Sequence, residues 1–219
     1  MSQSPQRVEV VGPEPSPELL TFLEGAAPGP VALDLVADPG ASPTLIGNPE
    51  RVARQAQRLA DWLRRRRRSL LIRAEGALFG PVFSLALSAD LLVLQGNVVG
   101  GLAIWEDRPL PLPGDLHVLT SRLPTGAAWE LLLLGERLDG EELARLGLAS
   151  SGETGGAAWE AALAGSRVAG EALAALRPRG PSRALAEALE RTAFARCFAR
   201  DDLSEGLAAF RQRRPPRFS

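Results

Sequence analysis

Residues 69–94 constrain the fold more than any other part of the chain, because they place one buried helix between two strands. Residues 69–74 and 91–94 are apolar runs of strand length, and residues 82–89 between them are apolar on almost every side. A helix without a polar face is stable inside a domain rather than on its surface. The sequence therefore predicts a strand, a helix and a strand packed together at the centre of the fold.

The turn that leads into this helix has the glycines of a ligand-binding turn. Gly76 and Gly80 stand four residues apart, and glycine-bearing turns between a strand and a helix commonly direct backbone N–H groups at a ligand. Pro81 follows directly and has no N–H to donate. We expect the shape of a ligand turn with one hydrogen-bond donor fewer than usual.

The chain upstream of this block alternates strands and helices. Strands are predicted at residues 8–11 and 31–37. Helices are predicted to begin at Pro17 and at residues 48–50, where proline, asparagine and acidic residues are typical of a helix N-terminus, and the second helix ends in the arginine run 64–68. The order strand, helix, strand favours parallel pairing, so the predicted fold class is α/β.

Downstream of the block the pattern is less regular. Residues 96–114 are rich in glycine and proline and predict mostly loop, with one short strand at 102–105. Two helices are predicted at 127–134 and 140–146. The glycine-rich SSGETGG at 150–156 predicts a linker, and the alanine-rich chain beyond it is predicted to be helical.

The composition excludes several classes of function. The 25 basic residues are balanced by 26 acidic ones, so nucleic acid is not a predicted partner. A single cysteine, Cys197, and a single histidine, His117, exclude a disulfide framework and a cysteine–histidine metal site. We interpret Cys197 as a buried apolar residue and His117 as a surface or helix-capping residue. No apolar run reaches the roughly 18 residues of a membrane span and no secretory pattern begins the chain, so no membrane is expected and a cytoplasmic location is predicted.

Three blocks of the sequence match the pattern of one known family. The first is the central block, which runs through the two glycines to Asp90. The second is LLLLGERLDGEELARLGLAS at residues 131–150, and the third is DDLSEGLAAFRQRRPPRF at residues 201–218. Together these blocks resemble the enoyl-CoA hydratase/isomerase family, the crotonases.

The resemblance implies a fold, a ligand and partners. The fold is a crotonase-like ββα spiral of the α/β class over residues 1–155, followed by a helical oligomerisation region at 156–219. The ligand is a coenzyme A thioester, acting as substrate, with no metal and no separate cofactor. The implied partners are further copies of the same chain in a trimer or hexamer, or another crotonase.

The resemblance also places the two backbone donors that hold the thioester carbonyl in this family. One donor falls within residues 40–47. The other falls at Pro81, between Gly80 and Val82, where this chain has no N–H. Losing one such donor costs about 3 kcal/mol, or roughly a hundredfold in rate.

The two glutamates that family hydratases use are absent from the corresponding positions. The position three residues beyond Pro81 is Ser84, and the position fourteen residues beyond Asp90 is Ile104. Neither side chain holds and delivers a proton as a carboxylate does, so ordinary hydration of an enoyl thioester is not expected.

Other acids nearby become the candidate catalytic groups. Glu106 ranks first, because it lies two residues from position 104 and beside Trp105, whose apolar ring would raise the pKa of the carboxyl. Asp115 is the second candidate, and Asp107 is also close in the sequence. The alternative is that these acids are simply solvated in a polar loop.

The arginine run has two interpretations as well. Arg64, Arg65 and Arg68 are candidates for binding the phosphates of coenzyme A, because a guanidinium binds phosphate through paired hydrogen bonds. Alternatively, the run is a solvated helix end, where cations complement the negative pole of the helix. Asp90 is predicted to be structural and to bind a neighbouring loop or backbone N–H.

Two functions from different classes stay open. The first is an acyl-CoA-binding enzyme of the hydratase/isomerase type with a non-standard active site. The second is a catalytically inactive crotonase homologue that serves as a CoA-binding or structural partner subunit.

Overall fold

A computed structural model gives the fold of the chain. It describes residues 5–10, 12–26, 30–45, 48–66, 68–164, 188, 208–209 and 211–214. The chain divides into two units after Pro178, and the elements below all belong to the first unit, Met1–Pro178. Cys197 and most of the terminal block lie outside the described residues.

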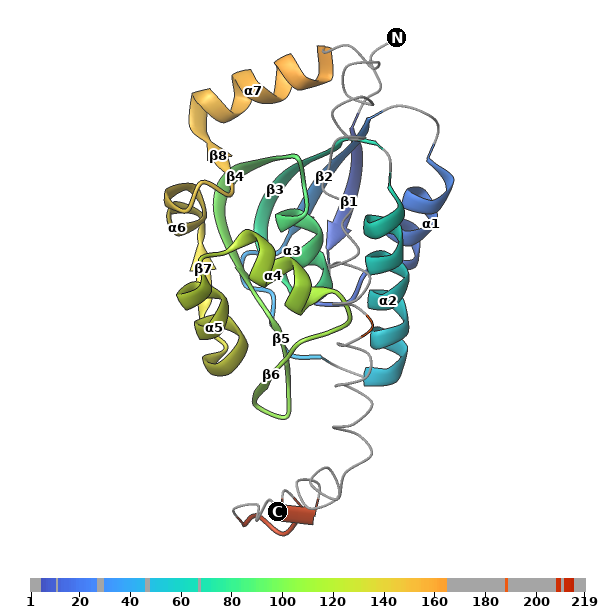
Figure 1. Ribbon diagram of the computed structural model, residues 1–219, viewed down its shortest axis with the longest axis vertical. Helices are drawn as coiled ribbons and strands as arrows, with labels where there is room; N and C mark the ends of the chain where they lie inside the picture. Colours follow the sequence, from blue (N-terminus) through green and yellow to red (C-terminus); the bar gives the residue numbers. More distant parts are fainter. Residues whose placement is uncertain are drawn as a thin grey trace. The chain divides into compact units, whose positions relative to one another are not determined.

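The first unit alternates strands and helices along the chain (Figure 1). Its elements are β1 (Gln6–Val10), α1 (Pro17–Gly25), β2 (Val31–Ala37), α2 (Pro49–Arg65), β3 (Leu70–Phe79), α3 (Gly80–Leu87), β4 (Leu91–Gly101), β5 (Ala103–Trp105), β6 (Arg108–Leu110), α4 (Asp115–Arg122), α5 (Thr125–Leu134), β7 (Arg137–Asp139), α6 (Gly140–Arg145), β8 (Ser150–Ser151) and α7 (Gly152–Ala164). No helix in the described ranges is long and apolar enough to cross a membrane.

The main sheet is parallel over its first four strands, which confirms the predicted pairing. Its order is β1-β2-β3-β4-β7, with β7 antiparallel to β4 and β8 paired with β4 on a branch. The register between β3 and β4 shifts after Glu75, where two extra residues of β4 separate the partners of Glu75 and Gly76. This irregularity lets both strands continue toward the turn that precedes α3.

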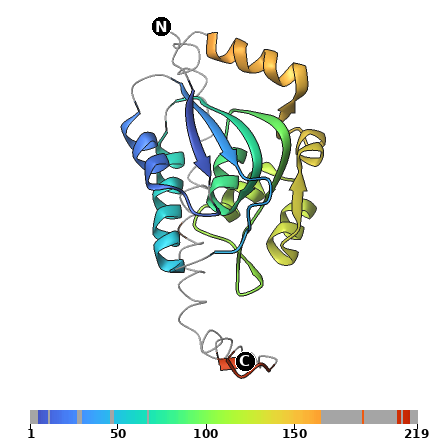
Figure 2. The same cartoon turned by 180° about the vertical axis from the view of Figure 1, so that it is seen from behind.

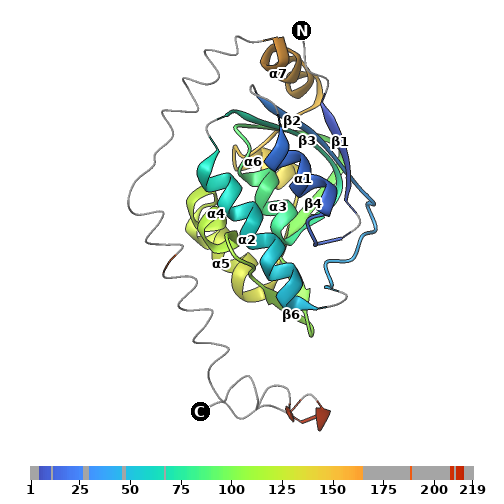
Figure 3. The same ribbon diagram turned by 90° about the vertical axis from the view of Figure 1, so that its right-hand side faces the viewer.

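One face of the sheet carries the main core. Leu33, Leu35 and Ile72 are fully buried on this face, together with Leu85 of α3. Helices α1, α2 and α3 cover the face, as Figure 3 shows from the side. Every residue of α3 is buried, which confirms the prediction of a central helix without a polar face.

The opposite face of the sheet, turned toward the viewer in Figure 2, is more polar. Asp34 of β2 pairs with Arg73 of β3 at 2.6 Å, and the two residues are register partners. Trp159 of α7 packs on this face with its ring 5.2 Å from the Arg73 guanidinium. The Trp159 side chain is only 2% exposed, so α7 is held to the sheet by a buried aromatic contact.

The helix starts follow from local capping chemistry. Ser16 accepts from the N–H of Leu19 at the start of α1, and Asn48 accepts from the N–H of Glu50 at the start of α2. Asp139 and Glu142 form a reciprocal capping box at the start of α6. These starts were predictable because each depends on residues within one helical turn.

Two expectations about the elements are wrong, and one helix lies where no element was predicted. Much of 96–114 is strand rather than loop, since β4 runs to Gly101 and a hairpin of β5 and β6 follows. A helix, α4, begins after Gly114 although its start has no side-chain cap. The expected linker at 150–156 consists instead of β8 and the first residues of α7. In the first and third cases, pairing with distant strands overrides the local preference of glycine for turns.

Candidate ligand site at the start of α3

The site is built around the glycines that join β3 to α3. Gly76 has a φ of 82°, and a Cβ there would lie 1.9 Å from the carbonyl oxygen of Ala37 in β2. Only glycine permits that approach, because it has no side chain and tolerates the left-handed region. Gly76 is therefore required for β2 and β3 to run side by side into the site.

The second glycine brings three segments together. Gly80 has a φ of 57°, and a Cβ there would lie 3.2 Å from the Cβ of Ala103 and 3.3 Å from the carbonyl oxygen of Pro13. Pro81, in the first turn of α3, is buried and has no N–H. The turn thus has the expected glycine geometry, and position 81 supplies no N–H to it.

Four N–H groups of the loop after β2 donate to acceptors within the chain. Gly40 donates to the Asp38 side chain at 2.8 Å, and Ala41 donates to the Asp38 carbonyl at 2.9 Å. Thr44 donates to the Ser42 hydroxyl at 3.1 Å, and Leu45 donates to the carbonyl of Ile104 at 2.9 Å. These four N–H groups lie in the range where the first thioester donor was expected, and each already has an acceptor. The N–H of Ser42, which lines the cavity described next, has no acceptor among the described residues, and residues 46–47 lie outside the described ranges.

A cavity of about 390 Å³ lies between this loop and the segment after β1. We call it the edge cavity, because it is found near the carboxyl ends of β1 and β2. Its walls include Pro13, which packs on Gly80, and Thr44, which bridges to Ile104. Ligands of α/β proteins commonly bind at this edge of a sheet.

The polar lining of the edge cavity comes from α2 and from the β1 side. Arg51 and Glu14 form an ion pair at 2.6 Å, and Glu9 is a second acid in the lining. The side-chain oxygen of Gln55 is buried and has no hydrogen-bond partner among the described residues. A buried acceptor in this state is satisfied when a ligand supplies an N–H.

Ser84 and Asp115 form a buried polar pair beneath this turn. The Ser84 hydroxyl donates to one Asp115 carboxylate oxygen at 2.5 Å, and the N–H of Leu112 donates to the other at 2.8 Å. The exposed fraction is 5% for Ser84 and 1% for Asp115. Asp115 of α4 therefore brings a buried carboxylate into contact with Ser84 of α3.

The other predicted site residues are not gathered at this pair. Ile104 lies in β5 and pairs with Thr44. Glu106 and Asp107 form the exposed turn between β5 and β6, with φ values of 48° and 62°. Glu106 thus lies in a solvated turn rather than in the apolar surroundings that the neighbouring Trp105 suggested.

The arginine run lies at the other end of α3. Helix α2 ends near the amino end of β3, whereas Pro81 follows the carboxyl end of β3. Arg64 pairs with Asp61 at 3.3 Å, Arg65 donates to the Asp61 carbonyl at 3.2 Å, and Arg68 donates to the Ala26 carbonyl at 2.8 Å. The eight residues of α3, about 12 Å of helix, lie between the arginine end and the glycine turn.

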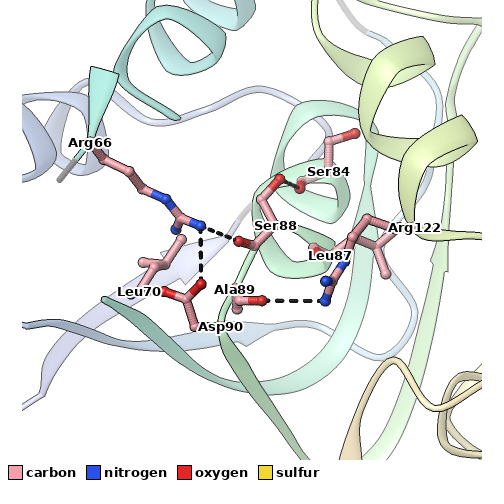
Figure 4. Close-up of polar contacts among 8 residues, drawn as sticks. All are labelled: Arg66, Leu70, Ser84, Leu87, Ser88, Ala89, Asp90 and Arg122. Carbon is pink, nitrogen blue, oxygen red and sulfur yellow. Dashed lines mark hydrogen bonds and ion pairs between the residues drawn. The ribbon is translucent and has the colours of Figure 1, made fainter. Parts of the chain in front are cut away.

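The polar contacts at that end are structural, as Figure 4 shows. Asp90 accepts from the N–H of Leu70 at 2.8 Å, which confirms the predicted role of Asp90. Arg66 donates to the Ser88 carbonyl at 2.6 Å and lies 3.6 Å from Asp90. Arg122 of α4 donates to the Leu87 carbonyl at 2.8 Å. Two cations thus complement the negative pole of α3.

The sequence interpretation missed the contact between Ser84 and Asp115 and the role of Arg122. A local signal was present for α4, because Asp115 follows a proline and a glycine and an acid is typical of a first helical turn. Nothing local pairs Ser84 with Asp115, which are 31 residues apart.

Comparisons with known proteins agree with this fold. No family model matches the chain. The mouse (Mus musculus) protein "Enoyl-CoA hydratase domain-containing protein 2, mitochondrial" is 32% identical over 157 residues, which are 66% of this chain and 53% of that protein. The match thus spans about half the length of this curated relative.

Solved structures of similar proteins cover more of the chain. Pseudomonas aeruginosa DspI is 26% identical, with a TM-score of 0.54 over 94% of this chain and 88% of that one. An enoyl-CoA hydratase from Mycobacterium avium subsp. paratuberculosis K-10 is 22% identical, with a TM-score of 0.62 over 94% of this chain and 89% of that one. The fold is accordingly the crotonase-like ββα spiral. With these likenesses, the glycine turn and the central helix in place, the chain is similar in sequence and in fold to members of the enoyl-CoA hydratase/isomerase (crotonase) superfamily.

Proposed function

We propose that this protein binds an acyl-CoA thioester in the edge cavity and does not hydrate it. The observation that carries the proposal is the state of the backbone around the turn. Pro81 has no N–H, while the N–H groups of Gly40, Ala41, Thr44 and Leu45 already have acceptors. A thioester can lie against such a turn, but the charge that develops on its oxygen during hydration receives little stabilisation there.

The edge cavity supports the binding half of the proposal. Its volume of about 390 Å³ lies within the range of small-molecule sites, roughly 300–1,000 Å³. The pantetheine arm of coenzyme A contains amide N–H groups, and Gln55 presents a buried oxygen that has no partner among the described residues. Pro13 connects the cavity wall to Gly80, so a pantetheine arm in the cavity would direct its thioester toward the turn.

The lack of acids supports the non-hydrating half. Hydration needs one group to activate water and one to protonate the substrate. Ser84 and Ile104 occupy the two family positions, and neither titrates. A water-activating pair of carboxylates is therefore missing from those positions.

Calorimetry and a turnover assay on the full chain test both halves. We expect butyryl-CoA and butyryl-pantetheine to bind, and we expect crotonyl-CoA to bind without conversion to the hydroxyacyl product. Replacing Gln55 with Met should weaken butyryl-pantetheine binding by about tenfold, because the ligand amide loses its acceptor. Gln57→Met is the matched control, since Gln57 lies on the same helix and contacts Asp61 instead. Absence of binding, or hydration at a measurable rate, would overturn the proposal.

A second candidate function rests on the contact between Ser84 and Asp115. A single carboxylate can shift a double bond, because it removes a proton from one carbon of an enoyl thioester and returns the same proton to another carbon. Asp115 would do this with Ser84 as its hydrogen-bonded neighbour. Conversion of 3-enoyl to 2-enoyl thioesters that disappears in Asp115→Asn would favour this function over simple binding, whereas unchanged conversion would eliminate it.

Assembly and location remain predictions for this chain. A trimer or hexamer is expected from the family, and sedimentation velocity of the full chain would measure it. A monomer at all concentrations would contradict that expectation.

A further inference from the structure

A second cavity has a volume of about 340 Å³. It lies at the amino ends of the parallel strands, whereas the edge cavity lies at their carboxyl ends. It is found where α1 and α2 end, near the amino end of β3. Its lining consists of Glu24, Arg58, Trp62, Arg65, Arg66 and Arg68, and we call it the arginine cavity.

The lining of the arginine cavity carries more positive than negative side chains, unlike the chain as a whole. Four arginines and one glutamate line it, a formal charge of 4 − 1 = +3, whereas the whole chain has a formal charge of −1. Asp90 lies 3.6 Å from Arg66 and offsets that guanidinium. An excess of positive charge still remains in a concave site, where charges of one sign attract an anion most effectively.

Backbone and side-chain contacts hold the four guanidinium groups in place. Arg66 donates to the Ser88 carbonyl, and Arg68 donates to the Ala26 carbonyl. Arg65 donates from its Nε to the Asp61 carbonyl, which leaves its terminal nitrogens without a hydrogen bond to the other described residues. The Arg65 guanidinium is held along one edge, so it loses less freedom when its other edge binds a ligand.

Glu24 acts as the resident anion of the cavity. Arg58 binds its carboxylate through two hydrogen bonds, of 3.1 Å and 2.7 Å. The pKa of Glu24 is lowered, mainly by the hydrogen bond from Arg58 and further by the charges of Arg58 and Arg65. The Glu24 carboxylate is thus hydrogen-bonded to Arg58 and is also stabilised by the charge of Arg65.

Trp62 supplies the remaining part of the lining. It is half-buried, packs against the main core and lines the cavity beside the arginines. An indole ring stacks on planar groups such as a nucleobase. Arginines and one aromatic ring in a cavity of this size match a phosphate ester that carries a planar base.

We propose that the arginine cavity binds a mononucleotide, with its phosphate on Arg65 and Arg68 and its base against Trp62. The cavity lies at the amino end of β3, so this ligand is a free nucleotide and not the nucleotide end of a thioester held at the glycine turn. The site is independent of the edge cavity and of the function proposed for it.

Calorimetry with adenosine monophosphate, inorganic phosphate and adenosine tests the site on the full chain. We expect the monophosphate to bind more tightly than either of the other two, because only it engages both the arginines and Trp62. Saturating butyryl-pantetheine should leave its dissociation constant unchanged, which separates this test from that of the edge cavity. Absence of monophosphate binding, or equal affinity for inorganic phosphate, would overturn the proposal.

Charge variants localise the binding. The double variant Arg65→Gln and Arg68→Gln should weaken monophosphate binding by about tenfold or more, since charge-assisted hydrogen bonds are lost. Arg54→Gln is the matched control, because Arg54 is an exposed arginine of α2 that pairs with Glu50. An equal loss in the control would show diffuse charge attraction and would overturn the site.

A gain-of-binding variant covers the case in which the double variant does not fold. Glu24→Gln removes the resident anion and frees Arg58, so monophosphate affinity should rise by about fivefold. An unchanged or lower affinity in a folded Glu24→Gln protein would contradict the assignment.

Discussion

The hydroxyl of Ser84 donates a hydrogen bond of 2.5 Å to the carboxylate of Asp115, which joins α3 to α4 inside the core. The short side chain of Ser84 leaves room for a carboxylate from another helix. The pair therefore places a buried acid beside α3, which itself carries no acidic residue.

Removing either member of the pair should destabilise the fold. Ser84→Ala is expected to lower the free energy of unfolding by about 1–3 kcal/mol, because it takes a donor from a buried carboxylate. Asp115→Ala should cost more, because it leaves both the Ser84 hydroxyl and the Leu112 N–H without an acceptor. Urea unfolding measures both changes.

A double variant separates the contact from its surroundings. The Ser84 and Asp115 substitutions should be non-additive by about 0.5–3 kcal/mol, because each removes the same hydrogen bond. Ser121→Ala is the control, since Ser121 bonds only within α4, to the carbonyl of Val118. Additive effects within error would mean that the hydroxyl and the carboxylate do not interact in solution.

Gly76 should be the least replaceable glycine of the described chain. Gly76→Ala places a Cβ 1.9 Å from the Ala37 carbonyl oxygen at a φ of 82°, so the strands must separate or the turn must change. We expect a loss of more than about 2 kcal/mol in the free energy of unfolding. Gly126→Ala is the control, because nothing lies within 4 Å of a Cβ there. Equal stability of the two variants would refute the close approach of β2 to β3.

The elements that the sequence predicts well are those fixed by neighbouring residues. The starts of α1 and α2 follow from Ser16 and Asn48, which cap the helices within one turn. The length of β4 was not predictable in this way, because residues 96–101 are extended through pairing with β3 and β7. Glycine-rich segments have weak local preferences, so tertiary pairing decides their conformation.

The candidate site shows the same division. The absence of a donor at Pro81 and of acids at positions 84 and 104 could be predicted, because these are properties of single residues in a family pattern. The internal bonding of the loop amides and the partner of Ser84 could not, because they depend on where Asp38, Ile104 and Asp115 lie in three dimensions. Sequence patterns thus indicate which groups are missing, and the fold determines what takes their place.

Stability should depend on pH through Glu24. Its pKa lies below the ordinary value of 4.5, mainly because Arg58 donates to the carboxylate. A lowered folded-state pKa contributes stability that is present above about pH 4.5 and is lost as the pH falls through the folded-state value. The melting temperature of the wild type should therefore exceed that of Glu24→Gln near neutral pH and converge with it at strongly acidic pH.

Arg58→Gln provides the control for this pH dependence. It removes the group that contributes most to lowering the Glu24 pKa, so it should remove most of the same acid-dependent part of the melting temperature, and the charge of Arg65 accounts for the rest. A difference between wild type and Glu24→Gln that stays constant across the acidic range would contradict the linkage to Glu24.

Restoring a backbone donor at position 81 should not restore hydration. Pro81→Gly introduces an N–H in the first turn of α3, at a stability cost of about 0.4–1 kcal/mol from the freer unfolded chain. Ser84 and Ile104 still lack carboxylates, so water is not activated. Crotonyl-CoA should remain unconverted, and the unfolding midpoint should fall slightly. Measurable hydration by Pro81→Gly would contradict this prediction, because it would mean that the missing N–H alone prevents hydration.

The ion pair between Arg51 and Glu14 should limit how well the edge cavity holds the charged end of a thioester. Glu14 occupies the guanidinium at 2.6 Å, and Glu9 adds a second negative charge to the lining. Glu14→Gln frees Arg51 for a phosphate oxygen and removes one repulsive charge, so butyryl-CoA should bind about fivefold more tightly. Butyryl-pantetheine has no phosphate, and its affinity should stay the same. Calorimetry of the two ligands distinguishes this effect from a general change in the cavity, because an equal gain for both would show that Arg51 does not meet the phosphates.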